Sequence, residues 1–217
     1  MTRKRVAVLI SGRGSNMAAL IAAARANDYP AEIVLVVSNV PDAGGLAIAK
    51  GAGIATVVVD HRAYGKDRTA FDHALQDVLL AHKIELVCLA GFMRLLTPWF
   101  VTQWQNRLLN IHPALLPAFK GLDTHARALR EGVKLHGATV HFVVADVDSG
   151  PIVAQGAVSV HEDDTEETLA ARVIKIEHRL YPLALRLVAE GRVSVTGGRC
   201  IIDGAETSDT PLLVPRP

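Results

Sequence analysis

Short apolar runs recur along the first half of the chain and alternate with segments of helical character. The runs cover residues 6–10, 33–37, 56–59, 86–89 and 108–111. Continuous apolar runs of this length are typical of strands that are buried on both faces of a parallel sheet. Helices are predicted between them, over residues 17–26, 43–52 and 67–82. The alternation predicts an α/β fold, a Rossmann-like, doubly wound and mostly parallel sheet with helices on both faces.

The pattern changes after residue 111. Residues 138–144 and 152–160 predict two further strands, which we expect to form an antiparallel extension of the sheet in the second half. Residues 193–202 predict a terminal hairpin around Gly197-Gly198. Residues 207–217 contain three prolines and no periodic pattern, so we expect a loose tail there.

One long amphipathic helix is predicted before the hairpin. Apolar residues from Leu169 to Leu187 recur at alternating spacings of four and three. Asp164 is the expected N-cap, because Glu167 follows three residues later as in a capping box. Pro182 lies inside the predicted helix, where it could introduce a kink.

Composition and charge narrow the class of protein. Half of the 217 residues are apolar and 21% are charged, which is ordinary for a globular domain with a sizeable core. The formal charge of +1 does not favour a nucleic-acid surface. No apolar run approaches the roughly 20 residues that span a bilayer, and Cys88 and Cys200 do not make a disulfide framework. We therefore expect a cytoplasmic protein that binds neither nucleic acid nor membrane.

Asn110 and His112 end the fifth predicted strand and precede Pro113, which stops a regular element. Residues i and i+2 of a strand point to the same side, so both side chains would face one pocket. An amide donor beside a titratable donor suits a carbonyl that becomes an oxyanion. Asp148 is the best candidate for a group that keeps the imidazole charged. An ordinary hydrogen-bonded histidine at a strand end fits the spacing equally well.

Residues 11–16 form a glycine-containing turn between the first strand and the first helix. Glycines let the backbone approach an anion, and the helix start presents free N–H groups. The turn lacks the lysine of a P-loop, and Met17 replaces the third glycine of a dinucleotide fingerprint. A phosphomonoester is the ligand that fits best, and a plain tight turn is the alternative.

Other polar residues have weaker signals. His136 and His141 would face opposite sides of one strand, and no metal-binding spacing is present, so we expect no metal site. Glu177 borders the apolar stripe of the long helix, where a glutamate is usually a solvated flank residue. Residues 91–96 follow the fourth strand and could line a slot for a flat aromatic ligand or pack beneath a loop.

Taken together, these segments resemble the phosphoribosylglycinamide formyltransferase family, the folate-dependent enzymes of purine synthesis. The matching stretches occur in order along the chain and cover residues 10–16, 89–94, 108–117, 136–142, 148–151 and 177–182. No single stretch is decisive, but the set is highly specific. The resemblance implies formyl transfer from 10-formyltetrahydrofolate, as co-substrate and without a metal, to the amine of 5-phosphoribosylglycinamide.

The resemblance also implies a role for individual residues. The residues that match the catalytic and acceptor-binding positions are Asn110, His112 and Asp148 for catalysis, Gly14, Ser15 and Asn16 for the phosphate, and Glu177 for the ribose or glycinamide side. Those that match folate-binding positions are Arg68 for the tail, Met93, Arg94, Leu95 and Leu96 for the pterin ring, and the loop with Val144 and Asp146 that closes over it.

A single formyltransferase domain over residues 1–217 is implied, acting as a monomer or a homodimer. It comprises a phosphate-binding parallel half at about 5–111, a folate and catalytic half at about 112–191, and the hairpin and tail at about 192–217. Asp123 stands where the family suggests a histidine, in the segment 119–132 that resembles a mobile loop.

Rivals come from two classes. A formyltetrahydrofolate hydrolase typically has an extra N-terminal domain, and a tRNA formyltransferase has a different sequence after its leucine-proline run, where this chain has residues 119–122. A non-catalytic phosphate-binding module on the same fold would explain the glycine turn but not Asn110, His112 and Asp148 together.

Overall fold

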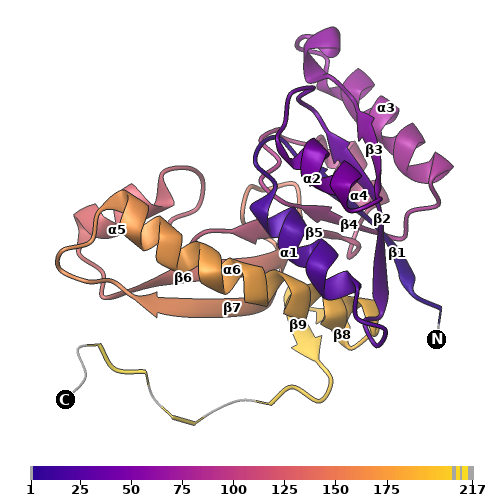
Figure 1. Ribbon diagram of the computed structural model, residues 1–217. Helices are drawn as coiled ribbons and strands as arrows, with labels where there is room; N and C mark the ends of the chain where they lie inside the picture. The colour runs from indigo at the N-terminus through magenta and orange to yellow at the C-terminus, as the bar shows by residue number, and fades with distance from the viewer. Residues whose placement is uncertain (1, 207–208, 211, 215–217) are drawn as a thin grey trace.

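A seven-stranded sheet forms the centre of the computed structural model, which describes residues 2–206, 209–210 and 212–214 (Figure 1). The strand order is β3-β2-β1-β4-β5-β6-β7. The strands are β1 (Lys4–Ile10), β2 (Ala31–Ser38), β3 (Ala55–Val58), β4 (Leu86–Leu89), β5 (Leu108–His112), β6 (Leu135–Phe142) and β7 (Ile152–Ser159). The first five strands pair in parallel, whereas β6 pairs antiparallel with both β5 and β7. The predicted parallel sheet and its antiparallel extension are therefore confirmed.

Helices cover both faces of this sheet, as predicted, because alternate strand residues point to opposite sides. In β1, Val8 belongs to one apolar core and Leu9 to the other. The first core lies beneath α1 (Ser15–Ala24), α2 (Gly45–Gly51), α5 (Thr124–Glu131) and α6 (Glu166–Ala189). The second lies beneath α3 (Arg68–Ala81) and α4 (Pro98–Gln103), with the short 3-10 helix η1 (His61–Tyr64) at its margin.

Three short helices were not predicted from the sequence. They are η1, α4 and α5, of four, six and eight residues. Elements of one or two turns show too little periodicity to be recognised from apolar spacing. No helix among the described residues has the length and apolar character to cross a membrane.

The start of α6 corrects the predicted cap. Thr165, not Asp164, is the N-cap, because its hydroxyl accepts the N–H of Thr168 while the Thr168 hydroxyl accepts the N–H of Thr165. Asp164 instead forms an ion pair with Arg172 at 2.7 Å. Hydrogen bonding from Arg172 holds the pKa of Asp164 well below its ordinary value. Arg172 lies in the second turn of the same helix, so its ion pair is a local contact that apolar spacing does not reveal.

The terminal hairpin is present as predicted. It consists of β8 (Val193–Thr196) and β9 (Arg199–Ile202), which pair antiparallel as a separate two-stranded sheet. Gly197 and Gly198 both have positive φ, the backbone of a tight two-residue hairpin turn. Of the predicted tail, residues 207–208, 211 and 215–217 lie outside the described part of the chain.

Candidate active site

Polar residues of the candidate site follow neighbouring strands at the carboxyl edge of the sheet. The glycine turn follows β1, residues 90–96 follow β4, and Asn110 and His112 lie at the end of β5. The chain leaves β1 toward β2 on one side and later returns to β4 on the other. Ligands in open α/β sheets bind at such a switch point.

The structure brings the three predicted catalytic residues together. His112 Nδ1 lies 3.3 Å from Asp148 Oδ2, and the side chain of His112 is only 6% exposed. Asp148 lies in the loop between β6 and β7, and its Oδ2 also accepts the backbone N–H of Gly121 at 2.9 Å. The cluster therefore combines the buried imidazole of His112 with the carboxylate of Asp148 and the half-buried amide of Asn110.

The segment before α5 closes this cluster. The carbonyl oxygen of Phe119 lies 2.9 Å from His112 Nε2, and Lys120 Nζ donates to Ser149 Oγ at 2.8 Å. Asp123, the residue that departs from the family pattern, adopts the left-handed backbone region with φ of 55° directly before α5. Residues 119–121 thus contact both His112 and the loop of Asp148.

Burial acts against the positive charge that the sequence analysis expects on His112. Asp148 raises the pKa of His112, as predicted, and so does the hydrogen bond to Phe119. Burial has the larger effect and lowers the pKa of His112 below its ordinary 6.5. Burial also acts to raise the pKa of Asp148, but His141, the Gly121 amide and His112 together lower it. The lowered pKa of His112 favours a neutral imidazole beside the carboxylate at neutral pH.

His141 is a member of the cluster that sequence reasoning missed. Its Nε2 lies 3.3 Å from Asn110 Nδ2 and 3.7 Å from Asp148 Oδ1, and its Nδ1 lies 2.8 Å from the carbonyl oxygen of Phe142. An Nδ1–H that donates to this carbonyl leaves Nε2 to accept from Asn110, which orients the amide. The antiparallel pairing of Asn110 with His141 explains the contact. The contact can be recognised only once the pairing register of β5 and β6 is known.

The glycine turn has the geometry of an anion site. Gly14 caps α1 in the left-handed region with φ of 76°, and no side chain caps the first N–H groups of the helix. A side chain on Gly14 would approach Gly45 Cα to 2.9 Å. Glycine at both positions therefore lets this turn pack against the start of α2 while its N–H groups stay open to a ligand.

Glu177 is buried beside the turn and is not a solvated flank residue. It is 7% exposed, and its Oε2 accepts from Asn16 Nδ2 at 2.6 Å. Burial raises the pKa of Glu177, and the hydrogen bond from Asn16 partly opposes this. Asn16 Oδ1 is buried without a hydrogen-bond partner in the described structure. A buried acceptor of this kind is suited to a donor group of a ligand.

Residues 91–96 present apolar side chains to solvent at the same edge. Met93 is 73% exposed and Leu95 is also exposed, while Leu96 is half-buried. Across the edge, Val144 and Val147 of the loop between β6 and β7 are exposed too. Exposed apolar side chains on two loops are typical of a binding slot.

The side chain of Arg94 turns away from this slot. Its guanidinium stacks on the Phe71 ring, 4.4 Å from the centroid. Arg68, the first residue of α3, is exposed one turn before Phe71. Asp146 is exposed in the loop between β6 and β7. Of these predicted folate contacts, Arg94 can therefore contribute through its backbone, whereas Arg68 and Asp146 have exposed side chains.

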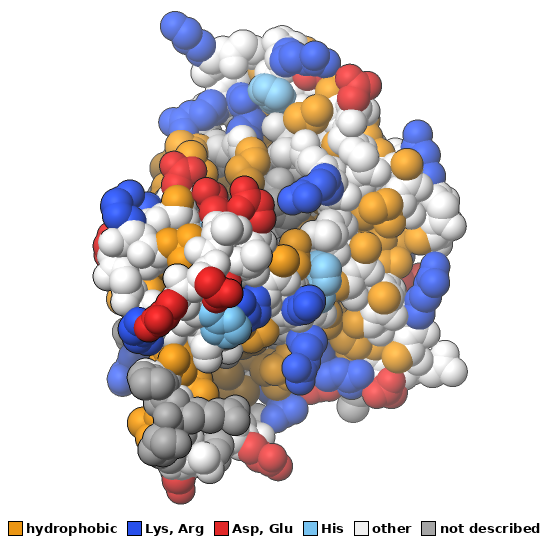
Figure 2. Space-filling view, turned by 60° about the vertical axis from the view of Figure 1, so that its left-hand side comes forward, with side chains coloured by type: hydrophobic (Ala, Val, Ile, Leu, Met, Phe, Trp, Pro, Cys, Tyr) orange, Lys and Arg blue, Asp and Glu red, His pale blue; other side chains and the backbone are white. Residues whose placement is uncertain are grey.

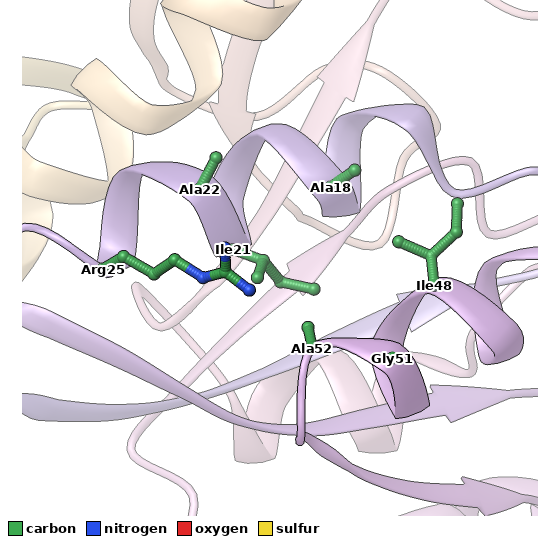
Figure 3. Close-up of a pocket in the computed structure, with 7 residues that line it drawn as sticks. All are labelled: Ala18, Ile21, Ala22, Arg25, Ile48, Gly51 and Ala52. Carbon is green, nitrogen blue, oxygen red and sulfur yellow. The ribbon is translucent and has the colours of Figure 1, made fainter.

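A hollow lies apart from the candidate site, between α1 and α2 (Figure 3). It has a volume of about 270 Å³ and is lined by Ala18, Ile21, Ala22, Arg25, Ile48, Gly51 and Ala52. Arg25 is the only polar side chain of this lining, so the hollow provides little to recognise a ligand. Figure 2 shows Lys and Arg side chains interspersed with Asp, Glu and hydrophobic side chains on the face in view.

His125 and His136 form a separate histidine pair near α5. Their nearest ring nitrogens lie 3.2 Å apart, and the ring of Phe119 packs edge-on against His136. Burial lowers the pKa of His136 to about 4 and also lowers the pKa of His125. The described residues contain no group of three or more His, Cys, Asp or Glu side chains that could hold a metal ion.

We expect the free energy of unfolding to fall as the pH falls from 6.5 to 4. Both histidines have folded pKa values below 6.5, so the unfolded state binds more protons in this window. Each contributes a slope of up to about 1.4 kcal/mol per pH unit. Urea unfolding at several pH values should give a smaller slope for His136→Gln than for wild type. His73→Gln, at an exposed histidine of α3, is the control, and an unchanged slope in His136→Gln would refute the assignment.

An amide and an imidazole that face one pocket, with a carboxylate beside the imidazole, suit acyl-transfer chemistry, in which a carbonyl oxygen gains negative charge. Comparison with known proteins agrees with this class of chemistry. A model of the family described as formyl transferase matches residues 4–185, and the chain belongs to this family.

The similar proteins cover the chain almost completely. The chain is 43% identical over 199 residues to phosphoribosylglycinamide formyltransferase of Escherichia coli (strain K12), covering 92% of this chain and 93% of that protein. It is 53% identical over 191 residues, 88% of the chain, to the trifunctional purine biosynthetic protein adenosine-3 of Gallus gallus, but spans only 19% of that protein's length. The crystal structure of glycinamide ribonucleotide transformylase 1 from Symbiobacterium toebii superposes with a TM-score of 0.89 and 48% identity, covering 92% of this chain and 94% of that one.

Proposed function

We propose that this chain transfers a formyl group from 10-formyltetrahydrofolate to the amine of 5-phosphoribosylglycinamide. The products are 5-phosphoribosyl-N-formylglycinamide and tetrahydrofolate. The observation that carries the proposal is the buried contact of His112 with Asp148 next to Asn110, at the switch point of the sheet. The relatives of nearly equal length, which bear the name of this activity, support it.

The acceptor would bind at the start of α1. The N–H groups after Gly14 and the side chain of Ser15 would hold the phosphate, where the helix dipole favours a negative charge. Asn16 would also hold the phosphate, and Glu177 would contact the ribose or the glycinamide side. The hydrogen bond between these two buried side chains supports a fixed, polar subsite.

The donor would bind between the loops after β4 and β6. Exposed apolar side chains at both loops, including Met93 and Val144, fit a flat aromatic ring. Backbone groups of residues 93–96 would recognise the polar edge of the pterin, and the loop with Asp146 would close over it. Arg68, exposed at the start of α3, would pair with carboxylates of the folate tail.

The chemistry follows from the cluster. The acceptor amine attacks the formyl carbon, a C–N bond forms, and the carbonyl oxygen gains negative charge. Asn110 Nδ2 donates to this oxygen, and the neutral His112 accepts the proton that the amine loses. The imidazolium that results stabilises the negative oxygen together with Asn110, and Asp148 stabilises the imidazolium. His112 then donates the proton toward the leaving nitrogen of the folate as the old C–N bond breaks, directly or through a water molecule.

An assay with and without the acceptor tests the proposal. The protein is incubated with 10-formyltetrahydrofolate, and the folate absorbance is followed before and after 5-phosphoribosylglycinamide is added. Turnover that requires the acceptor supports formyl transfer. Turnover without the acceptor would support a hydrolase instead. The absence of turnover under both conditions would support a non-catalytic ligand-binding module.

We expect the double substitution Ser15→Ala and Asn16→Ala mainly to weaken binding of the phosphorylated acceptor. Hydrogen bonds to a charged group contribute about 1.5–3 kcal/mol each, so the affinity should fall at least about tenfold. Titration calorimetry with 5-phosphoribosylglycinamide measures this change. The ribonucleoside that lacks the phosphate is the control ligand, whose weaker binding should change less. An intact fold with unchanged acceptor affinity would remove the phosphate assignment.

The setting of this activity is part of the proposal. We infer a cytoplasmic enzyme whose single domain spans residues 1–217 and acts as a monomer or homodimer. The unpaired cysteines Cys88 and Cys200 suit a reducing compartment. Light scattering coupled to gel filtration would decide between the two assembly states.

A further inference from the structure

Ser11 joins the glycine turn to the segment that follows β4. Its backbone N–H donates to the carbonyl oxygen of Gly91 at 3.1 Å, and its hydroxyl oxygen accepts the backbone N–H of Met93 at 2.7 Å. The hydroxyl contact links residues 82 positions apart in the chain. Together the two hydrogen bonds fasten the first half of residues 91–96 to the turn that begins at Ser11.

Asn39 fixes the orientation of the Ser11 hydroxyl. This hydroxyl donates to Asn39 Oδ1 at 2.6 Å, so a lone pair of its oxygen is directed at Met93. Asn39 is itself held in place and is only 3% exposed. Its backbone carbonyl oxygen accepts the backbone N–H of His61 at 3.3 Å and lies 2.7 Å from His61 Nδ1. The bonds run in one direction, from Met93 through Ser11 to Asn39, and hydrogen bonds in such chains strengthen one another.

Sheet topology explains why these residues meet. Asn39, Ser11 and Gly91 follow β2, β1 and β4, three neighbouring parallel strands that end at the same edge. The proposed reaction uses the turn after β1 for the acceptor and the segment after β4 for the formyl donor. Ser11 begins the turn after β1, and its hydroxyl contacts the segment after β4.

We propose that the Ser11 hydroxyl, held by Asn39, is a positioning group that couples acceptor binding to donor binding. The inference rests on the proposed function, since it requires one ligand at each part. A phosphate that orders residues 12–16 fixes Ser11, and Ser11 then holds Met93 in place before the donor arrives. Linkage requires the effect to be reciprocal, so the donor favours acceptor binding by the same factor.

Calorimetry with an unreactive ligand pair tests the coupling. Tetrahydrofolate, the product form of the donor, is titrated with and without saturating 5-phosphoribosylglycinamide. We expect the acceptor to raise tetrahydrofolate affinity about fivefold or more in wild type and hardly at all in Ser11→Ala, the scale of one hydrogen bond. Ser11→Thr keeps the hydroxyl and should retain most of the effect. In turnover, Ser11→Ala should raise the KM for 10-formyltetrahydrofolate by about the same factor and change kcat less.

Ser38→Ala is the matched control. Ser38 is a buried serine at the end of the neighbouring strand β2, and its hydroxyl bonds only to the backbone of Val40 among the described residues. Ser38→Ala should leave unchanged the factor by which 5-phosphoribosylglycinamide raises the affinity for tetrahydrofolate. Coupling that is absent in wild type, retained in Ser11→Ala, or equally lost in Ser38→Ala would overturn the inference. A wild-type protein that binds neither ligand would refute the proposed function itself.

Discussion

Replacing His112 by alanine is expected to reduce formyl transfer by about 10²–10³-fold, the usual cost of one oxyanion-stabilising group. In the proposed mechanism His112 also carries the proton from the attacking amine, so the loss could be larger, although the two roles need not add. The side chain is buried, and its contacts are with Phe119 and Asp148 and not with residues 11–16 of the glycine turn. Binding of 5-phosphoribosylglycinamide should therefore change little.

Single-turnover kinetics and calorimetry together measure this effect. His73→Ala removes an exposed histidine from α3 and should retain full turnover. Thermal unfolding of His112→Ala shows whether the cavity has destabilised the fold. A folded His112→Ala protein that keeps more than a tenth of the wild-type rate would contradict the central role of this residue.

The second large effect is expected from Asp148→Asn, which keeps the shape of the side chain and removes its charge. Asp148 raises the pKa of His112 against the stronger lowering by burial, so the pKa should fall further in the variant. A less basic imidazole accepts the amine proton less readily, and the imidazolium loses its carboxylate partner. We expect transfer to slow by about 10²–10⁴-fold, the range for a positioned proton-transfer group.

The pH dependence gives the sign of this effect. A neutral His112 is needed at the first step, so the rate should fall as the pH drops through the pKa of His112. In Asp148→Asn this acid limb should move to lower pH while the plateau falls. NMR titration of His112 in both proteins measures the shift directly, with Asp163→Asn, an exposed carboxylate before α6, as the control. An unchanged pKa of His112 would exclude the electrostatic role, even if the rate fell.

Local patterns made much of the fold predictable. The strands of the parallel half are continuous apolar runs, and the turn at Gly14 needs a positive φ that glycine adopts without strain. The pairing of Asn110 with His112 on one side of a strand also follows from local geometry. These features depend on residues that are neighbours in the chain, so the sequence alone was enough to predict them.

Contacts between distant segments decided the rest. His141 joins Asn110 through the antiparallel register of β5 and β6, and Ser11 meets Met93 because β1 and β4 are neighbours in the sheet.

The burial of Glu177 and His112 also depends on contacts between distant segments. The apolar stripe of α6 indicated a solvated Glu177, but packing of α6 against α1 buries it beside Asn16. Spacing suggested that Asp148 would keep His112 charged, but the pKa of His112 depends on how much water the assembled loops exclude. The sequence therefore determined which chemical groups stand at the carboxyl edge of the sheet. The tertiary structure decided their partners and protonation, because desolvation and pairing depend on the packing of segments that are far apart in the chain.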